Sequence, residues 1–361
     1  MSNLRRVGVI GATGMVGQRF VTLLANHPWF RIAALAASPR SAGKTYEEAV
    51  GSRWAMSDPI PESVKNMTVL DASDVEGVSS RVDFVFCAVD MPKDQIRSLE
   101  EAYARAETPV ISNNSANRGT PDVPMIIPEI NPQHMEIIPS QRKRLGTRIG
   151  FIAVKPNCSI QSYVPALSAL ADFGPEKAIV STYQAISGAG KTFSRWPEML
   201  DNVIPYIGGE EEKSEEEPLK IWGTILGDAI VPTDSPIISA QCVRVSVSDG
   251  HLATCWVDLR KPAKREEIIE RWRNYSGLPQ KLRLPSAPVP FMQYFDENDR
   301  PQTRLDRDFG NGMGISLGRL RGSSLFQWRF VGLSHNTLRG AAGGGVLIAE
   351  LLCESGYIPS K

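Results

Sequence analysis

The sequence predicts a two-domain fold of the α/β class, and three observations support this prediction. The chain has 361 residues, more than one ordinary compact domain contains. Its first part alternates apolar strand patterns with helical patterns around a glycine-rich turn, as in a parallel sheet covered by helices. From residue 151 the pattern changes to alternating, β-branched stretches. We therefore expect one domain over residues 1–150 and a second, α+β domain with a mixed sheet over residues 151–336.

The glycine-rich turn defines the character of the first domain. An apolar strand pattern over residues 7–10 runs into GATGMVG, residues 11–17, and then into a helical pattern. Glycines let the backbone approach a pyrophosphate closely, and the N-terminus of the next helix offers free N–H groups. Residues 31–37, 82–89 and 108–112 are typical of further buried parallel strands. This arrangement indicates a Rossmann-type dinucleotide-binding domain, with five candidate cofactor-binding residues: Gly11, Thr13, Gly14, Met15 and Val16.

The end of the second strand pattern bears on the choice of dinucleotide. An NAD site usually carries Asp or Glu there to accept from the ribose 2′-OH, whereas this chain has hydroxyls and cations. Such groups suit a 2′-phosphate, so we expect NADP. The alternative is that Arg40 and Lys44 only solvate the loop. The candidates for this contact are Ser38, Arg40, Ser41 and Lys44.

Composition excludes several classes of partner. Forty basic residues balance forty acidic ones, so charge gives no sign of nucleic acid or of an anionic membrane surface. No apolar run approaches the roughly 18 residues of a membrane span, and the first residues show neither a long apolar h-region nor a cleavage site. The five cysteines are scattered, without CxxC or metal-ligand spacing. We expect a cytoplasmic protein with a small-molecule substrate and neither a disulfide framework nor a metal site.

Cys158 is the candidate nucleophile. It lies in VKPNCSIQ, and the helical pattern over residues 159–173 would place it at a helix entrance. Free N–H groups there stabilise a thiolate and can receive an oxyanion. Pro165 predicts a kink or a later start of the helix. Cys255 is a formal rival, but it is expected in mid-strand, and the other cysteines suit packing positions.

Arg244 and His251 flank a predicted β-hairpin. Asp249 and Gly250 form a two-residue turn signal between two alternating stretches. In this register Arg244 pairs with Cys255, the alternate valines face the core, and both Arg244 and His251 point away from it. The two side chains could then converge on one small substrate, as a carboxylate-binding cation and a base.

Seven motifs, in order over nearly the whole chain, resemble aspartate-β-semialdehyde dehydrogenase in its archaeal and fungal branch. They are GATGMVGQRF, SNNSANR, KPNCSIQ, TYQAISGAGK, EEEK, the 244–251 stretch and SHNTLRGAAGG. The resemblance implies NADPH-dependent reductive dephosphorylation of L-4-aspartyl phosphate to L-aspartate 4-semialdehyde and phosphate, on the route to lysine, methionine and threonine. It also implies a homodimer or homotetramer. The small residues before the apolar stretch 346–352 separately predict a C-terminal helix, within residues 337–361, that packs back on the first domain.

The resemblance implies roles for the residues that react. Cys158 matches the nucleophile that forms the acyl-enzyme, and Asn157 lies beside the expected oxyanion site. Gln184 matches the residue that orients the thioester. Arg244 matches the arginine that binds the substrate α-carboxylate, and His251 matches the acid/base catalyst, for which a pKa near neutrality is suitable.

Further residues match the phosphate, amine and nicotinamide contacts of the family. Arg118 and Lys213 match the phosphate-binding cations. Glu210 matches the carboxylate that meets the substrate amino group, and Glu211 or Glu212 could take this role instead because the acidic run leaves the register open. Without the resemblance, EEEKSEEE is typical of a solvated loop. The positions expected near the nicotinamide are Ser187, Gly188 and Asn336.

Three other functions remain open at this point. A malonyl- or succinyl-CoA reductase would keep Cys158, His251 and the cofactor site but take a CoA thioester. An N-acetylglutamyl-phosphate reductase would not need Glu210, because its substrate amine is acetylated. A non-catalytic NADP sensor would have no physical need for a nucleophile with a base.

Overall fold

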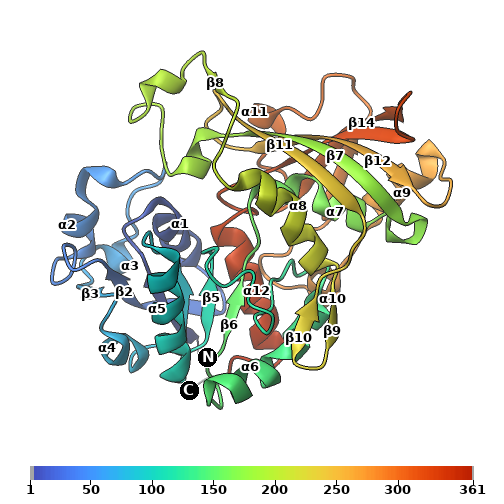
Figure 1. Cartoon of the computed structure of the whole chain (residues 1–361). Coiled ribbons are helices and arrows are strands. Elements are labelled where there is room, and N and C mark those ends of the chain that lie inside the picture. Colours follow the sequence, from blue (N-terminus) through green and yellow to red (C-terminus); the bar gives the residue numbers. More distant parts are fainter. Residues whose placement is uncertain (1–3, 360–361) are drawn as a thin grey trace.

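Two β-sheets organise the chain, one in the N-terminal and one in the C-terminal part (Figure 1). The structure, a computed structural model, describes residues 4–359. The outer limits predicted for the two ends of the chain, residues 1 and 361, therefore lie outside the described residues. No helix within residues 4–359 combines the length and the apolar character that crossing a membrane would require.

The first sheet is fully parallel, with strand order β3-β2-β1-β4-β5-β6. Its strands are β1 (Arg5–Ile10), β2 (Phe30–Ala37), β3 (Val69–Asp71), β4 (Phe84–Cys87), β5 (Val110–Ser112) and β6 (Ile152–Val154). The chain reverses its direction of strand addition between β1 and β4, and dinucleotides bind at such a point. The predicted Rossmann-type domain is confirmed.

Helices cover both faces of this sheet, as a parallel sheet requires. They are α1 (Met15–Leu24), α2 (Tyr46–Val50), α3 (Glu62–Lys65), α4 (Val75–Ser79), α5 (Lys93–Arg105) and α6 (Ile138–Leu145), with the 3₁₀ turns η1 (Gly51–Arg53) and η2 (Pro132–Ile137). The C-terminal helix α12 (Ala342–Glu354), red in Figure 1, packs on α1 and β5. Its side chains share an apolar cluster with α1 and β1.

The second sheet is mixed, as predicted, with strand order β13-β14-β15-β12-β7-β11-β8. Its strands are β7 (Pro175–Gln184), β8 (Val203–Ile204), β11 (Ile237–Val245), β12 (His251–Leu259), β13 (Met292–Phe295), β14 (Ile315–Gly322) and β15 (Trp328–Ser334). A separate pair is formed by β9 (Thr224–Leu226) and β10 (Ala229–Val231). The helical segments are η3 (Ser159–Ser162), α7 (Val164–Ser168), η4 (Ala171–Phe173), η5 (Ile186–Ala189), η6 (Pro197–Met199), α8 (Glu210–Ile221), α9 (Arg265–Arg273), α10 (Leu278–Leu282) and α11 (Thr303–Asp306).

The predicted hairpin between β11 and β12 is wrong. Strand β7 lies between them, parallel to β11 and antiparallel to β12. The chain does reverse its direction near Asp249 and Gly250, but β7 separates the two strands. Just beyond the end of β7, the backbone N–H groups of Ile186 and Ser187 donate to carbonyls of residues 247 and 248, which connect β11 to β12. A local turn signal carries no information about a strand inserted from some 60 residues upstream.

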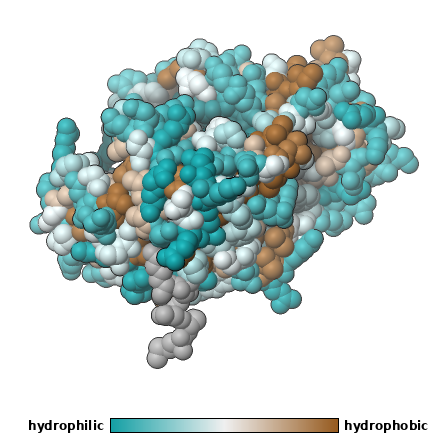
Figure 2. All heavy atoms as spheres, turned by 60° about the horizontal axis from the view of Figure 1, so that its bottom comes forward, coloured by the Kyte–Doolittle hydropathy of each residue, from teal (hydrophilic) through white to brown (hydrophobic). Residues whose placement is uncertain are grey.

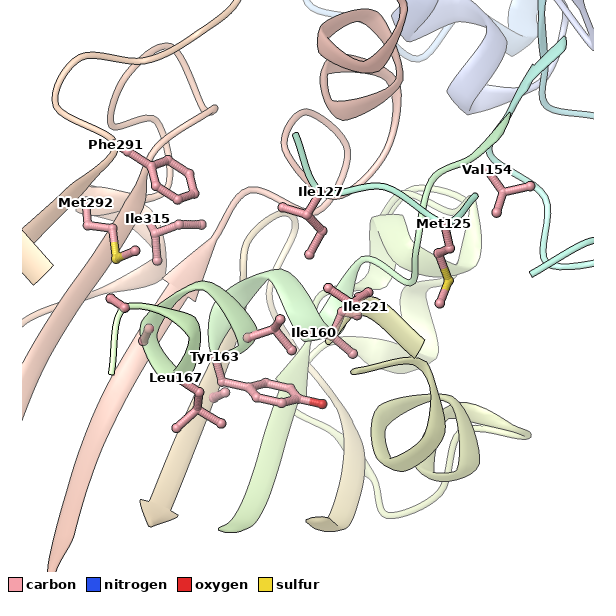
Figure 3. Close-up of a cluster of buried hydrophobic side chains, with 14 of the residues drawn as sticks. Met125, Ile127, Val154, Ile160, Tyr163, Leu167, Ile221, Phe291, Met292 and Ile315 are labelled. Carbon is pink, nitrogen blue, oxygen red and sulfur yellow. The ribbon is translucent and has the colours of Figure 1, made fainter. Parts of the chain in front are cut away.

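The predicted orientation of these two strands is also inverted. Arg244 and His251 are buried, whereas the alternate positions of the same strands, Val243 and Leu252 among them, are only partly covered. The reason is that η3, with α7 packed beside it, covers β12 and β15, and that α8 covers β11. Figure 3 shows this layer, in which Ile160, Tyr163 and Leu167 join one apolar cluster.

The opposite face of the second sheet is open in the single chain. Large apolar side chains on β7 and β11 are exposed there, Ile237 to 70% and Ile179 to 43%. The visible surface in Figure 2 is mostly hydrophilic, with hydrophobic atoms in separate patches. An open sheet face of this kind is typical of a surface that a partner covers.

Candidate active site

Cys158 and His251 meet at the junction of the two sheets. Cys158 follows β6 of the first sheet and His251 begins β12 of the second, and the Sγ and Nε2 atoms are 3.4 Å apart. The two residues are 93 positions apart in the chain. The structure therefore brings the predicted nucleophile and its predicted partner within contact distance.

The expected long helix after Cys158 is absent from the described structure. Residues 159–173 form the 3₁₀ turn η3, the short helix α7 with Pro165 in its first turn, and the 3₁₀ turn η4. One 3₁₀ turn offers little dipole to a thiolate. Burial, with a further contribution from Glu210, raises the pKa of Cys158 to about 11, against the opposing effect of Lys155, Arg118 and Arg244. The long helix that the sequence predicts at Cys158, whose N-terminus would stabilise a thiolate, is therefore replaced in the described residues by these short turns.

The ring of His251 is held in one neutral tautomer. The backbone N–H of Ala185 donates to Nδ1 at 3.0 Å, so Nδ1 is an acceptor and the proton of the neutral ring is on Nε2. Burial, followed by the charge of Arg244, lowers the pKa of His251 to about 3. The expected pKa near neutrality is therefore wrong, and the ring directs an N–H donor toward Sγ of Cys158.

Glu210 connects several of the predicted site residues. Its carboxylate accepts from Asn157 Nδ2 at 3.0 Å and from Gln184 Nε2 at 3.2 Å, and it pairs with Lys213 Nζ at 2.8 Å. Although burial acts to raise its pKa, Lys213 and these hydrogen bonds lower it below the ordinary value. Glu211 instead accepts from Gln241 and from the backbone of β11, and Glu212 is exposed. Of the three glutamates left open by the sequence, Glu210 is the one that faces the cluster.

The acidic run is a helix, α8, and not a solvated loop. Its inward face carries Glu217, whose carboxylate accepts from Arg118 Nη1 at 2.8 Å and from the backbone N–H of Asn157 at 2.6 Å. One turn further, Lys220 Nζ donates to three carbonyls of residues 118–123. Sequence reasoning missed Glu217 and Lys220, although both lie seven positions after a predicted site residue, two helical turns along one face.

The loop at η5 closes over Arg244 and His251. A Cβ on Gly188 would lie 2.9 Å from Arg244 Nη1 and 3.1 Å from His251 Nε2, so a larger residue would displace one of them. Arg244 Nη1 also donates to the carbonyl of Ala185 at 2.7 Å. Asn336 accepts from the N–H of Gly250 and donates to Ser187 Oγ, both at 2.8 Å, which fixes this loop to the end of β15.

A cavity of about 380 Å³ opens above Cys158. The predicted residues that line it are Val16, Arg118, Asn157, Cys158, Ser187, Gly188, Glu210, Lys213 and Asn336. Asn113, Asn114 and Lys93 line it as well and were not predicted. Gln184, Arg244 and His251 are not in its wall and lie behind it as buried groups.

A second cavity of about 760 Å³ adjoins the first and shares its walls at residues 89–91. Gly11, Thr13, Gly14 and Ser38 line it. Met15, Arg40, Ser41 and Lys44 do not, whereas Arg53, which sequence reasoning missed, does. Arg53 lies sixteen residues after Ala37, the end of β2, and only the folding of η1 back over the turn brings it here.

The residues of the glycine turn fit a dinucleotide. Gly11 has φ +87°, and a Cβ there would lie 2.3 Å from the carbonyl oxygen of Ala88. A Cβ on Gly17 would lie 2.2 Å from the carbonyl oxygen of Gly11. Gly14, the N-cap of α1, provides no side-chain cap, so the first N–H groups of this helix are free for a phosphate.

Comparisons with known proteins agree with this geometry. Two family models match, the NAD-binding domain of semialdehyde dehydrogenase over residues 6–138 and its dimerisation domain over residues 167–339. The aspartate-semialdehyde dehydrogenase of Aspergillus fumigatus is 43% identical, with 98% of each chain covered, and that of Methanothermobacter thermautotrophicus is 44% identical, with 96% of this chain and 99% of the relative covered. The crystal structure of the Candida albicans enzyme with NADP superimposes with a TM-score of 0.88 at 38% identity, over 99% of this chain and 100% of that one.

Proposed function

The chain belongs to the aspartate-semialdehyde dehydrogenase family, and from this premise we propose the roles of its own residues. Its activity is that of an NADP-dependent oxidoreductase of amino-acid biosynthesis. The full-length relatives do not favour the CoA-reductase alternative. The observation that carries the assignment of roles is the contact of Cys158 with His251 beside the cavity of the glycine turn.

The first step is acyl transfer to Cys158. Its thiolate attacks the carbonyl carbon of aspartyl phosphate, the C–S bond forms, and the C–O bond to phosphate breaks. Arg118 and Lys213 are placed to stabilise the leaving phosphate, because both line the cavity above Cys158. Glu217 holds Arg118 in place and at the same time orients the backbone before Cys158.

The second step is reduction of the Cys158 thioester. NADPH bound at the glycine turn supplies the hydride. The Nε2–H of His251 donates to the oxyanion of the resulting thiohemiacetal, and the collapse of this oxyanion releases the aldehyde and restores the thiolate. A neutral ring that directs its proton toward the reacting sulfur suits this donor role.

The remaining groups of the substrate determine specificity. We assign its α-carboxylate to Arg244, whose guanidinium can form a bidentate pair, and its ammonium to Glu210, whose pKa lies below the ordinary value. Gln184 orients the thioester, and its bond to Glu210 supports this position. Ser187, Gly188 and Asn336 contact the nicotinamide end of the cofactor. Ser38, with Arg40, Ser41 and Lys44 nearby, receives the 2′-phosphate, and the presence of Arg53 in the same cavity adds a cation.

We also propose the organisation in which these residues work. Residues 1–150 form the NADP-binding domain, residues 151–336 form the catalytic and dimerisation domain, and the helix within 337–361 completes the first. A homodimer or homotetramer covers the open apolar face of the second sheet, and no nucleic acid is involved. A cytoplasmic location suits a catalytic thiol that must stay reduced.

The test is phosphate-dependent reduction of NADP with L-aspartate semialdehyde as substrate, followed at 340 nm. Parallel reactions replace the substrate by succinate semialdehyde, or phosphate by CoA. We expect turnover with the first combination alone. Turnover that requires CoA and ignores phosphate would contradict the assignment.

A further inference from the structure

A third cavity, of about 330 Å³, adjoins the cavity above Cys158. The two cavities share walls at Lys93, Ser115, Arg118 and Lys213. Arg118 and Lys213, the proposed phosphate-binding residues, therefore face both of them. The proposed reaction takes place in the cavity above Cys158 and gives the third cavity no role.

The wall of the third cavity passes from exposed to buried residues. Gly119 and Pro232 are exposed, whereas Ile230 is buried. Arg118 in the same wall donates from Nη1 to Glu217 at 2.8 Å, and its Nε is buried without a hydrogen-bond partner among residues 4–359. A guanidinium with an unused donor at a cavity wall suits a ligand that accepts hydrogen bonds.

Positive charge predominates in the third cavity. Arg118 is paired with Glu217 at 2.8 Å. Lys213 is paired with Glu210, also at 2.8 Å. The ammonium of Lys220 donates to three backbone carbonyls, which do not neutralise its charge. An excess of positive charge therefore remains, and the cavity favours an anion. The charged side chains of its wall are four cations and two carboxylates: Lys93, Arg118, Lys213, Lys220, Glu216 and Glu217.

Lys93 lies where the third cavity meets the cavity above Cys158. It is the first residue of α5, it is exposed, and its ammonium makes neither a hydrogen bond nor an ion pair within the described chain. The stem of a lysine is flexible, so the ammonium can follow a ligand from one cavity to the other. Its three donors and its charge suit a phosphate dianion.

The cofactor covers a different side of the cavity above Cys158. The cavity of the glycine turn joins it at residues 89–91. The nicotinamide end is assigned to Ser187, Gly188 and Asn336, in the wall of the cavity above Cys158. A bound dinucleotide therefore fills the connection between these two cavities. Phosphate that arrives while the cofactor is bound needs another approach, and the third cavity provides one.

We propose that the third cavity is the route by which inorganic phosphate reaches and leaves the acyl-enzyme, with Lys93 as its docking site. In the oxidative direction, phosphate first pairs with the ammonium of Lys93 and then passes to Arg118 and Lys213. Its oxygen attacks the thioester carbonyl carbon, the C–O bond forms and the C–S bond breaks. The electron pair of the C–S bond returns to Cys158 as the thiolate. The inference rests on the phosphate-dependent reaction proposed above.

The first test changes the charge of Lys93. Reduction of NADP with L-aspartate semialdehyde is followed at 340 nm while the phosphate concentration is varied. We expect kcat/KM for phosphate to fall roughly tenfold in K93M, because a charged cleft raises on-rates of a counter-ion by roughly 10- to 1,000-fold. The loss should shrink in 1 M KCl, where the Debye length is about 3 Å. K93R should keep the wild-type value, and so should K143M, at an exposed lysine of α6 that lines none of the three cavities.

The second test blocks the third cavity without a change of charge. Gly119 lines this cavity and not the one above Cys158, and a Cβ added to it would meet nothing within 4 Å. We expect kcat/KM for phosphate to fall in G119F at least as far as in K93M, whereas the KM for NADP and for the aldehyde stays unchanged. G119A, which adds only the Cβ, is the matched control and should behave as the wild type. G119L replaces G119F if the larger residue prevents folding.

A reaction without phosphate separates this route from the proposed reaction itself. Acylation and hydride transfer then still release one equivalent of NADPH per active site as a burst. We expect the same burst in the wild type, K93M and G119F. A wild type that shows neither the burst nor a dependence on phosphate would overturn the proposed reaction, and this inference with it.

Other outcomes bear on the route alone. If the wild type shows both the burst and the phosphate dependence, unchanged kcat/KM for phosphate in a folded G119F or G119L would overturn the route. A fall in K93M without one in the Gly119 variants would place the action of Lys93 in the cavity above Cys158, which also overturns it. A fall in the Gly119 variants alone would overturn the role of Lys93.

Discussion

The turn that receives the cofactor is made of consecutive residues, 11–17, whereas the catalytic centre joins Cys158 to His251 across 93 positions. In the turn, a Cβ on Gly11 or Gly17 would clash with the backbone of a neighbouring segment. In the catalytic centre, the site depends on β7, α8 and η5, which reach it from different parts of the chain. The turn is thus a local site, which tolerates little change in its own residues. The catalytic centre around Cys158 and His251 is a distributed site, which also depends on residues that do not contact the substrate.

The largest effect is expected at the distributed site itself. C158S replaces the thiol by a hydroxyl of far lower nucleophilicity, and we expect turnover to fall at least about 10⁴-fold, as when a nucleophile is removed from other enzymes. Phosphate-dependent NADP reduction measures it. C255S, at a buried thiol remote from the cavity, is the matched control and should retain turnover.

The local site is tested by two neighbouring glycines. In G17A the new Cβ would lie 2.2 Å from the carbonyl oxygen of Gly11, so we expect a loss of about 1–3 kcal/mol in the free energy of unfolding, measured in urea. In G14A the nearest contact is an ordinary 3.5 Å, so the fold should stay stable while the KM for NADP rises. Equal stability of G17A and the wild type would contradict the role of the close contact.

Glu217, to which no substrate contact is assigned, tests whether the distributed site depends on supporting residues. E217Q removes the charge that holds Arg118 while an amide oxygen can still accept from the N–H of Asn157. We expect about a tenfold rise in the KM for phosphate, equivalent to about 1.4 kcal/mol, with a smaller change in kcat. E212Q, at an exposed position of the same helix, is the control. A fall in kcat alone would assign Glu217 to the nucleophile loop and not to the phosphate.

The smallest effect concerns pH and stability. The pKa of His251 is about 3 in the folded protein and about 6.5 when unfolded. Because the folded value is the lower one, the contribution of His251 is fully present above pH 6.5 and is lost as the pH falls toward 3. We expect the wild type to lose about 1 kcal/mol more than H251N between pH 6 and pH 5. Urea unfolding at the two pH values measures it, and identical pH dependence would show that folding does not lower the pKa of His251.

Several parts of the site could be predicted because their signals are local. The turn at residues 11–17 needs glycine at its own positions, and the β-strand patterns of the first sheet are continuous apolar runs. The family resemblance that identified Cys158, Glu210 and His251 likewise rests on short sequence motifs. These residues do meet around one cavity or directly behind it.

Other parts could not be predicted, since their partners are remote in the chain. The stretch around Asp249 and Gly250 has a hairpin signal, yet β7 pairs with both strands. Arg40 and Lys44 are adjacent to the end of β2, yet the cation in the cavity wall is Arg53. In each case the neighbouring residues do not determine the contact by themselves. It is determined by a segment distant in the chain, β7 in the first case and η1 in the second.

The sequence by itself determined the parallel sheet, the glycine turn and the identity of the groups that carry the chemistry, because period, turn geometry and side-chain type are properties of neighbouring residues. Only the tertiary structure decided which face of β12 is buried, which tautomer His251 adopts, and that Glu217 binds both Arg118 and the backbone N–H of Asn157 beside Cys158. Burial, hydrogen bonding and local charge belong to the assembled protein. They set the pKa of a thiol or an imidazole, and no residue specifies them alone.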